Sequence, residues 1–288
     1  MKNKLKILDC TLRDGGYYNQ WDFEASTVDK YVKAMIVAKV DYVEIGFRNF
    51  SQNHFLGPYA YSTDSFLNNI KNIEKLNIAV MSDASIFLGD KKDIKNKVRQ
   101  LYNYKEKSPV SLVRIAVHYN SVEESKDILL TLNELGYSVA LNLMQTGGKT
   151  AIEIESVVKI ISSWDVVETL YFADSLGNMD NEEVVSIIKI LNNCWNKELG
   201  IHTHNNKGKA ISNSLAALNH GVTWIDATVQ GMGRGAGNGA TEDLLREINN
   251  INGDFYHPQS LYKLALEEFG ALQKKISMGT KFTLFIGS

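Results

Sequence analysis

Short apolar runs alternate with longer amphipathic stretches along the whole chain. Apolar runs of this length are typical of strands buried on both faces, and we expect strands over residues 5–9, 42–46, 78–82, 112–117, 138–143, 166–172, 199–204 and 224–228. Between them, apolar positions recur with helical spacing, which predicts helices over residues 26–38, 64–76, 91–104, 122–135, 151–162, 182–192, 207–219 and 241–251. Side chains typical of helix N-caps stand at the start of some of these stretches, namely Ser26, Asp64, Ser121 and Asp180.

The regular alternation of strand and helix decides the expected fold. Strand–helix–strand units favour parallel pairing through right-handed crossovers. Eight such units predict an α/β protein with a closed (β/α)8 TIM barrel. An open doubly wound sheet is the alternative, but the first predicted strand is not followed by a glycine-rich dinucleotide-binding turn. We expect the barrel over residues 1–255. Residues 256–288 should form a short C-terminal helical tail on the barrel, with its helix over 261–276.

Composition narrows the class of protein. The chain has 288 residues, of which 44% are hydrophobic, and a formal net charge of −2. This charge favours no nucleic-acid partner. No apolar run approaches the length of a membrane span or of a signal-peptide core, so we expect no membrane association. Cys10 and Cys194 are the only cysteines and make no disulfide framework, so the expected location is the cytoplasm.

Two motifs at predicted strand ends carry metal-binding side chains. His202 and His204 are two positions apart on the seventh strand, so both imidazoles should point to the same face. Asp14, in the Arg-Asp-Gly-Gly turn after the first strand, is the best carboxylate to complete a facial set of ligands for a divalent metal. Taken alone, the two histidines could equally lie on a solvated strand end. Cys10 is a minor candidate ligand, because it should point away from Asp9 along the strand.

Charged and glycine-rich segments adjoin this predicted metal site. Arg13 presents a planar fork that could stabilise an enolate or carboxylate oxygen, or could form a structural salt bridge. Glu44, at the end of the second strand, could hold Arg13 in place, which is compatible with both roles. The glycine-rich segment 231–239 follows the eighth strand without the lysine of a P-loop, so nucleotide binding is not expected. Within it, Asn238 is either a fourth metal ligand or a residue that fixes the loop.

These motifs together resemble the DRE-TIM metallolyase superfamily, also called HMG-CoA lyase-like, over roughly residues 5–250. The branch that they resemble most is that of the 4-hydroxy-2-oxovalerate aldolases. Residues 11–15 resemble the first motif of the family, Glu44 its glutamate, residues 202–205 its His-x-His and residues 231–238 its glycine-rich loop. The resemblance implies that residues 1–255 are a catalytic domain.

The resemblance also implies roles for single residues. The implied ligands of Mn²⁺ or Mg²⁺ are Asp14, His202, His204 and, as in the lyase branch, Asn238. Arg13 would stabilise the enolate and Glu44 would orient Arg13. The aldolases carry a histidine, thought to be the base, where this chain has Tyr17, which leaves Tyr17, His54 and His118 as candidates. From their places at strand ends, His118 and Asp174 are expected to bind substrate together with Arg13.

The expected activity is that of a carbon–carbon lyase. It would cleave or form a 4-hydroxy-2-oxo acid by way of a pyruvate enolate and an aldehyde. The alternatives are a Claisen-type acyltransferase that joins acetyl-CoA to a 2-oxo acid, a Schiff-base aldolase, and a non-catalytic barrel scaffold. A homodimer is compatible with the family. We expect no channelling dehydrogenase partner, because the chain is too short for most of the extension that binds one in bifunctional relatives.

Overall fold

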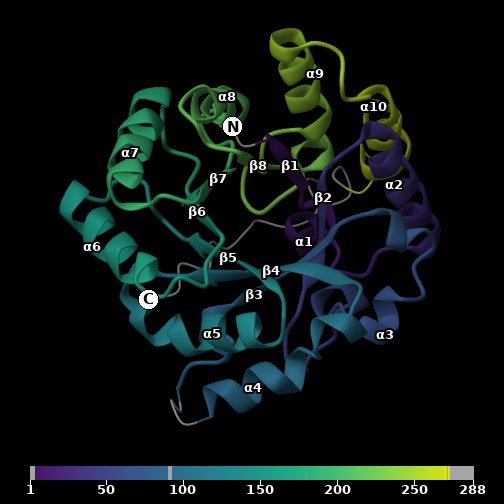
Figure 1. Ribbon diagram of the computed structural model, residues 1–288. Coiled ribbons are helices and arrows are strands. Elements are labelled where there is room, and N and C mark those ends of the chain that lie inside the picture. Colours follow the sequence, from purple (N-terminus) through teal and green to yellow (C-terminus); the bar gives the residue numbers. More distant parts are fainter. Residues whose placement is uncertain (1–3, 90–92, 271, 273–288) are drawn as a thin grey trace.

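Eight parallel strands close into a barrel in chain order, as predicted (Figure 1). The computed structural model describes residues 4–89, 93–270 and 272. The strands are β1 (Lys6–Asp9), β2 (Tyr42–Phe47), β3 (Ile78–Asp83), β4 (Val110–Val117), β5 (Ser138–Leu143), β6 (Thr169–Asp174), β7 (Glu198–Thr203) and β8 (Trp224–Ala227). Because β1 pairs with both β2 and β8, the sheet has no free edge.

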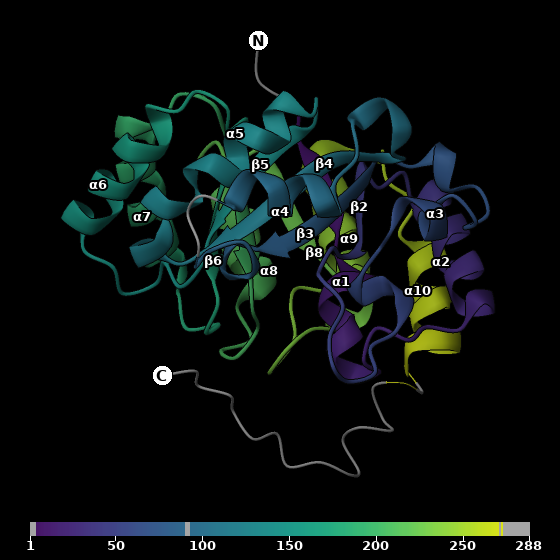
Figure 2. The ribbon, with the colours of Figure 1, turned by 90° about the horizontal axis from the view of Figure 1, so that it is seen from below.

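The helices lie around the outside of the barrel, as Figure 2 shows from a second direction, except for the short α1 (Thr11–Asp14), which directly follows β1 at the end of the barrel. The others are α2 (Ala25–Ala38), α3 (Asp64–Leu67), α4 (Ile94–Leu101), α5 (Lys126–Glu134), α6 (Ala151–Ser162), α7 (Asn181–Cys194), α8 (Ala210–Asn219), α9 (Thr241–Asn252) and α10 (Gln259–Leu264). The long ones bury one apolar stripe, as α7 does with Val184, Ile187 and Leu191. Among the described residues, no helix is long and apolar enough to cross a bilayer.

Of the predicted N-caps, Asp180 is confirmed, whereas Ser26 and Asp64 are not the capping residues. Asp180 caps α7 as predicted, because its carboxylate accepts the Glu183 N–H. Glu24 precedes α2 in place of Ser26, since the chain is already helical at Ala25. In the predicted helix 64–76, Thr63 is the N-cap, and Asp64 is the first helical residue.

The predicted helices over 64–76 and 122–135 are interrupted by turns, and those over 91–104 and 207–219 are observed as Ile94–Leu101 and Ala210–Asn219. The first, over 64–76, ends as α3 after one turn, and Asn72 then adopts a left-handed conformation with φ of 61° that no α-helix accommodates. The second, over 122–135, becomes α-helical only from Lys126, because 3₁₀ turns occupy residues 119–125. Ser121 lies in those turns and is therefore not an N-cap.

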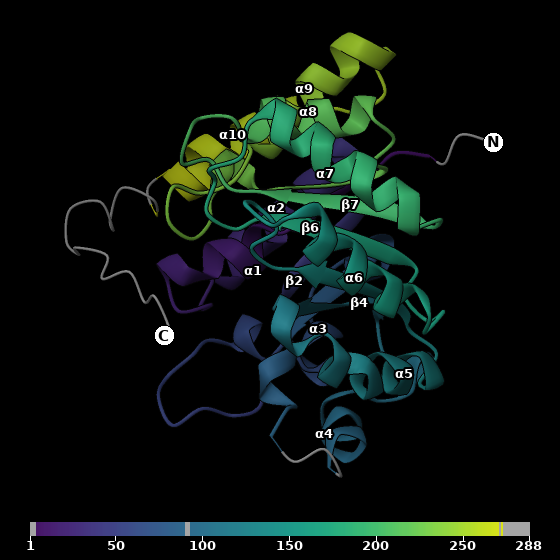
Figure 3. The same ribbon diagram turned by 90° about the vertical axis from the view of Figure 1, so that its left-hand side faces the viewer.

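The barrel interior divides into an apolar lower part and a polar upper part. Inward-facing side chains of the lower part form one buried cluster, made of Leu8, Cys10, Ala79, Leu112, Ala140, Tyr171 and Trp224. Below it, at the N-terminal ends of the strands, Lys6 Nζ lies 2.8 Å from a carboxylate oxygen of Glu198. At the opposite end lie the C-terminal ends of the strands, where α1 follows β1 along the chain; Figure 3 shows α1 at this end of the barrel.

The C-terminal tail packs against α2, as Figures 1 and 2 both show for α10. A π-helical turn, Ala265–Phe269, continues α10. Its Phe269 ring contacts Tyr31 edge-to-face, with ring centroids 6.3 Å apart. The tail helix predicted over 261–276 thus begins at Gln259. The part of it beyond residue 272, and the rest of the tail, lie outside the described residues.

Candidate active site and metal centre

One carboxylate and two imidazoles converge at the mouth of the barrel. Asp14 ends α1, directly after β1, while His202 and His204 lie at the end of β7. All three side chains are buried, and their potential ligand atoms lie within 4.8 Å of one another. The two imidazole centroids are 5.1 Å apart. The structure therefore brings together the three residues that the sequence motifs proposed as metal ligands.

A tight turn after β1 delivers Asp14 to this position. Asp9 points away from the barrel interior, and its Oδ1 accepts hydrogen bonds from the Thr11 N–H at 2.9 Å and the Thr11 hydroxyl at 2.6 Å. Further along, the Trp21 indole donates to the carbonyl of Arg13 at 2.7 Å. A Cβ atom at Gly16 would lie 2.0 Å from that indole, so glycine is required there.

The charges of the three side chains suit a divalent metal. Burial alone would raise the pKa of Asp14. The charge of Arg13, the hydrogen bond and charge of His202 and the charge of His204 together outweigh burial, and they hold this pKa well below its usual range. Burial lowers the pKa of His204 to about 4, which leaves its imidazole neutral at pH 7. For His202, burial is outweighed by hydrogen bonds to Asp14 and Asp226, which raise its pKa. One carboxylate and two imidazoles could thus hold a divalent ion.

Asn238, in the glycine-rich loop, lies beside the Asp14 carboxylate. Its Nδ2 donates to Asp14 Oδ2 and, at 3.3 Å, to the Met232 carbonyl. Its Oδ1 is buried and has no hydrogen-bond partner among the described residues. A half-turn of the amide would place that oxygen beside the Asp14 carboxylate, where it could serve as a ligand. A Cβ at Gly233 would lie 2.5 Å from Asn238 Nδ2, so this loop approaches the site only with glycine there.

Arg13 is held rigidly beside the metal ligands. Its Nε donates to Glu44 Oε1 at 2.7 Å, and its Nη1 lies 3.0 Å from Asp14 Oδ1. The guanidinium carbon stands 5.6 Å from the centroid of the Phe47 ring. Nη2 is buried without a hydrogen-bond partner in the described part of the chain. Arg13 therefore keeps a donor for an anionic oxygen, with Glu44 fixing its orientation.

Two buried charges in the barrel interior were missed by the sequence analysis. Arg114 lies on β4 two positions after the inward-facing Leu112, and Asp226 lies on β8 two positions after the inward-facing Trp224. Arg114 Nη2 is 2.7 Å from Asp226 Oδ2, and the same oxygen is 2.8 Å from His202 Nδ1. The signal that could have found them is a charged residue at an inward position of an otherwise apolar strand.

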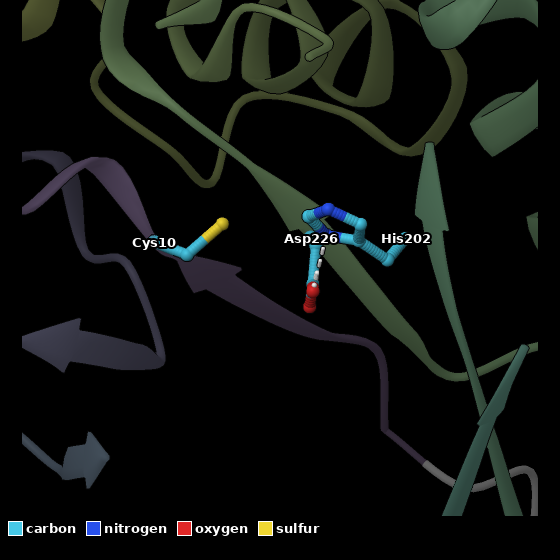
Figure 4. A group of neighbouring side chains, drawn as sticks. All are labelled: Cys10, His202 and Asp226. Carbon is cyan, nitrogen blue, oxygen red and sulfur yellow. Dashed lines mark hydrogen bonds and ion pairs between the residues drawn. The ribbon is translucent and has the colours of Figure 1, made fainter. Parts of the chain in front are cut away.

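Cys10 forms a second group of potential ligand atoms with His202 and Asp226, shown in Figure 4. It points away from Asp9, as predicted, and that direction is the barrel interior. Burial raises the pKa of its thiol well above the usual range, so the sulfur stays protonated. Its Sγ donates to the Ala227 carbonyl at 3.5 Å. A neutral thiol beside a carboxylate already bonded to Arg114 is a poor second metal site.

The candidate bases lie around the mouth. Tyr17 is 41% exposed and packs edge-to-face on Trp21, with ring centroids 4.7 Å apart. Burial and the Asp14 charge raise the pKa of Tyr17, so its phenol is protonated at neutral pH and suits a proton donor better than a base. His118 is exposed at the end of β4, and His54 is exposed in the segment after β2. The assignment of the base stays a prediction.

Asp174 stands apart from the converging side chains. In the sheet, Ala173 is in register with His202, and Asp174 with Thr203, so Asp174 faces away from the interior. Its carboxylate accepts the N–H groups of Asn178, at 2.9 Å, and Met179, at 3.2 Å. These contacts shape the loop after β6, and the substrate-binding role predicted for Asp174 stays a prediction.

Glu242 anchors the other side of the glycine-rich loop and makes stability depend on pH. Its buried carboxylate accepts the Gln230 N–H at 3.0 and 3.1 Å, and burial raises its pKa to about 7 from an ordinary 4.5. The folded state therefore holds the proton more tightly than the unfolded chain. Its stabilising contribution is complete below about pH 4.5 and is lost as pH rises through about 7.

We expect Glu242→Gln to remove this contribution to the pH dependence. Between pH 5 and pH 8, the free energy of unfolding of the wild type should fall as Glu242 loses its proton. In the variant, the fall over the same range should be smaller by about 3 kcal/mol. Urea unfolding at several pH values measures the difference. The exposed Glu74→Gln should keep the wild-type slope. Parallel curves for wild type and Glu242→Gln would contradict the expectation.

The sequence is similar to a protein family and to named relatives. The profile of the HMGL-like family matches residues 4–266. The chain is 28% identical over 258 residues to a 4-hydroxy-2-oxovalerate aldolase of Geobacillus genomosp. 3, covering 87% of this chain and 72% of that protein. A protein of the same name from Pelotomaculum thermopropionicum is 29% identical over 248 residues, with coverage of 85% and 70%.

A solved structure is similar over nearly the whole chain. It is the N-terminal domain of a proposed aldolase from Bacteroides vulgatus, with a TM-score of 0.84 and 30% sequence identity. The match covers 94% of this chain and 88% of that one. The family profile spans β1 to the π-helical turn after α10, and so includes every residue of the candidate site. The chain therefore belongs to the HMGL-like family, as the resemblance of its motifs predicted.

Proposed function

We propose that the protein is a divalent-metal-dependent aldolase. It would cleave a 4-hydroxy-2-oxo acid into pyruvate and an aldehyde, or join the two in the reverse direction. The observation that carries the proposal is the convergence of Asp14, His202 and His204 beside an arginine that keeps a free buried donor. The relatives named 4-hydroxy-2-oxovalerate aldolase support a carbon–carbon lyase.

Different residues of the site would bind the metal and stabilise the enolate. Asp14, His202 and His204, with Asn238, would hold the ion, for which we propose Mn²⁺ or Mg²⁺. When bound, such an ion polarises the keto oxygen of the substrate. In cleavage, a base takes the proton of the C4 hydroxyl, the C3–C4 bond breaks, and its electron pair moves into the enolate while C4 becomes the aldehyde carbon. Arg13 faces the negative charge that develops on the enolate oxygen.

The Claisen-type acyltransferase is the other activity that such a site could support. The names of the relatives favour the aldolase. The two reactions differ in a directly measurable product, because only the acyltransferase releases free thiol from acetyl-CoA. A panel of 2-oxo acids with acetyl-CoA and a thiol reagent should therefore give no signal above background.

Removal of the metal should abolish cleavage. After dialysis against EDTA, we expect the rate of cleavage of 4-hydroxy-2-oxo acids to fall by at least about 100-fold. The reason is that the polarising ion supplies several kcal/mol of transition-state stabilisation. Addition of Mn²⁺ or Mg²⁺ should restore it. Pyruvate formation, followed with lactate dehydrogenase and NADH, measures the rate, and metal content is determined on the same samples.

The contradicting outcomes point to other mechanisms. Full activity in metal-free protein, together with a lysine adduct trapped by borohydride and pyruvate, would indicate a Schiff-base aldolase. We expect no adduct, because Lys6 is the only lysine within the strands of the described residues. It is bonded to Glu198 at the opposite end of the barrel from the candidate site. A homodimer, a cytoplasmic location and the lack of a channelling dehydrogenase stay predictions.

A further inference from the structure

Acidic and basic side chains of the candidate site alternate in a closed ring in the barrel. In order around the ring they are Arg13, Glu44, Arg114, Asp226, His202 and Asp14. Half of the ring touches the proposed metal or substrate directly. The other half, Glu44, Arg114 and Asp226, lies deeper in the barrel and is connected to the reaction only through its neighbours.

Arg114 is the centre of the deeper half. It is fully buried, its Nη2 lies 2.7 Å from Asp226 Oδ2, and its Nη1 lies 3.4 Å from Glu44 Oε2. Its guanidinium carbon stands 4.1 Å from the centroid of the Tyr171 ring, which supports it from the apolar side. A buried arginine cannot lose its charge, so it needs both carboxylates and in turn fixes their positions.

Asp226 contacts both Arg114 and His202, a proposed metal ligand. A carboxylate only accepts hydrogen bonds, so its 2.8 Å contact with His202 Nδ1 places the proton on that nitrogen. The lone pair of a neutral His202 is then on Nε2, which lies 3.6 Å from Asp14 Oδ2 at the proposed metal centre. Carboxylates in this position orient ligating histidines and strengthen them as ligands.

Glu44 contacts both Arg114 and Arg13, the arginine proposed to bind the enolate. One of its oxygens faces Arg114 and the other accepts the Nε–H of Arg13 at 2.7 Å. Glu44 is fully buried, and its described charged partners are the two arginines, through an ion pair with Arg114 and a hydrogen bond from Arg13. A shift of the Arg114 side chain would therefore disturb the enolate-binding arginine as well as the metal ligand.

We propose that Arg114 is a positioning residue that couples the two halves of the active site, holding His202 through Asp226 and Arg13 through Glu44. The inference rests on the proposed function for its consequences in catalysis. The contact between Arg114 and Asp226 also explains why Asp226, hydrogen-bonded to His202 in Figure 4, supports that histidine and does not form a second metal site with it and Cys10.

The test is a double-mutant cycle read out by metal affinity. Arg114→Lys keeps the charge but cannot reach both carboxylates, and it should weaken Mn²⁺ binding, measured by calorimetry on metal-free protein, by about 10-fold. Asp226→Asn should weaken it by about 10- to 100-fold. Because Arg114 acts on the metal through Asp226, Arg114→Lys should add little loss in the Asp226→Asn background. Additive losses, or wild-type affinity in Arg114→Lys, would overturn the proposal.

A second readout needs neither metal nor activity. In metal-free wild-type protein, the Nδ1 proton of His202 should give a low-field proton resonance in the NMR spectrum, identified by its loss in His202→Gln. Arg114→Lys should shift or remove this resonance, and the exposed Arg99→Lys should leave it unchanged. An unshifted resonance in Arg114→Lys overturns the coupling. A wild-type protein that shows the resonance but binds no Mn²⁺ would instead refute the proposed function alone.

If Arg114→Lys does not fold, Asp226→Glu is measured by itself in the Mn²⁺ titration and in the NMR spectrum, because it cannot be combined with Asp226→Asn at the same position. The longer carboxylate of this variant keeps the charge but cannot keep the 2.7 Å and 2.8 Å contacts together. We expect weaker Mn²⁺ binding and a displaced His202 resonance. Wild-type Mn²⁺ affinity with an unshifted resonance would then overturn the proposal. In the aldolase assay, the coupling also requires Arg114→Lys to lower kcat at saturating Mn²⁺, because Arg13 is disturbed. A normal kcat under that condition would confine the role of Arg114 to the metal side and overturn the coupling.

Discussion

Asp14→Asn should abolish binding of Mn²⁺ at micromolar concentrations and lower kcat by about 10³-fold or more. The carboxylate is the only anion among the three proposed ligands, and Arg13, His202 and His204 together lower its pKa against the effect of burial. An amide in its place leaves two imidazoles, which with one carbonyl oxygen hold a divalent ion far more weakly. Loss of the ion removes several kcal/mol of stabilisation from the developing enolate, which corresponds to this fall in rate.

The measurements are calorimetric titration of metal-free protein with Mn²⁺ and the pyruvate assay at saturating Mn²⁺. Asp22→Asn is the matched control, because Asp22 is exposed a few residues further along the same segment. It should bind Mn²⁺ and turn over like the wild type. Thermal unfolding of both variants excludes a general loss of structure. Wild-type Mn²⁺ affinity in Asp14→Asn would remove Asp14 from the metal site.

The fold could be predicted because its main determinant is repeated along the sequence. Each strand–helix unit carries its own periodicity, and an error in one unit leaves the others intact. The errors come from single residues whose backbone overrides the apolar pattern. Asn72 is such a residue, since its left-handed conformation cannot belong to the helix that the pattern continued to residue 76, and α3 has already ended at Leu67. A left-handed backbone conformation of this kind is not visible in hydrophobic periodicity.

The site could be predicted only where spacing alone determines direction. His202 and His204 share a face because they are two apart on one strand, and this holds for either orientation of the strand. For Asp174, the sequence placed the residue at the correct strand end, but its face depends on the register with β7. Arg114 and Asp226 were missed for the same reason, since pairing between β4 and β8 side chains depends on closure of the whole barrel.

Arg13→Lys should have the opposite signature to Asp14→Asn, with kcat reduced by about 10²- to 10³-fold and Mn²⁺ affinity nearly unchanged. Lysine keeps the positive charge beside Asp14 but loses the fork that contacts Glu44 and Asp14 together and leaves Nη2 free. The lost interaction is the donor to the developing oxyanion, whose removal typically costs this factor in rate. Mn²⁺ titration and steady-state kinetics on the same preparation measure both quantities.

The control for Arg13→Lys is Arg246→Lys, which changes an exposed arginine of α9 that contacts Asp243 and Glu247. It should retain the wild-type kcat and Mn²⁺ affinity. A fall in Mn²⁺ affinity in Arg13→Lys as large as that in Asp14→Asn would mean that Arg13 mainly keeps Asp14 ionised. A normal kcat would mean that the enolate is stabilised elsewhere. We expect turnover to be lost while the metal stays bound, because Asp14 and the histidines would bind the metal and Arg13 would stabilise the charge of the enolate.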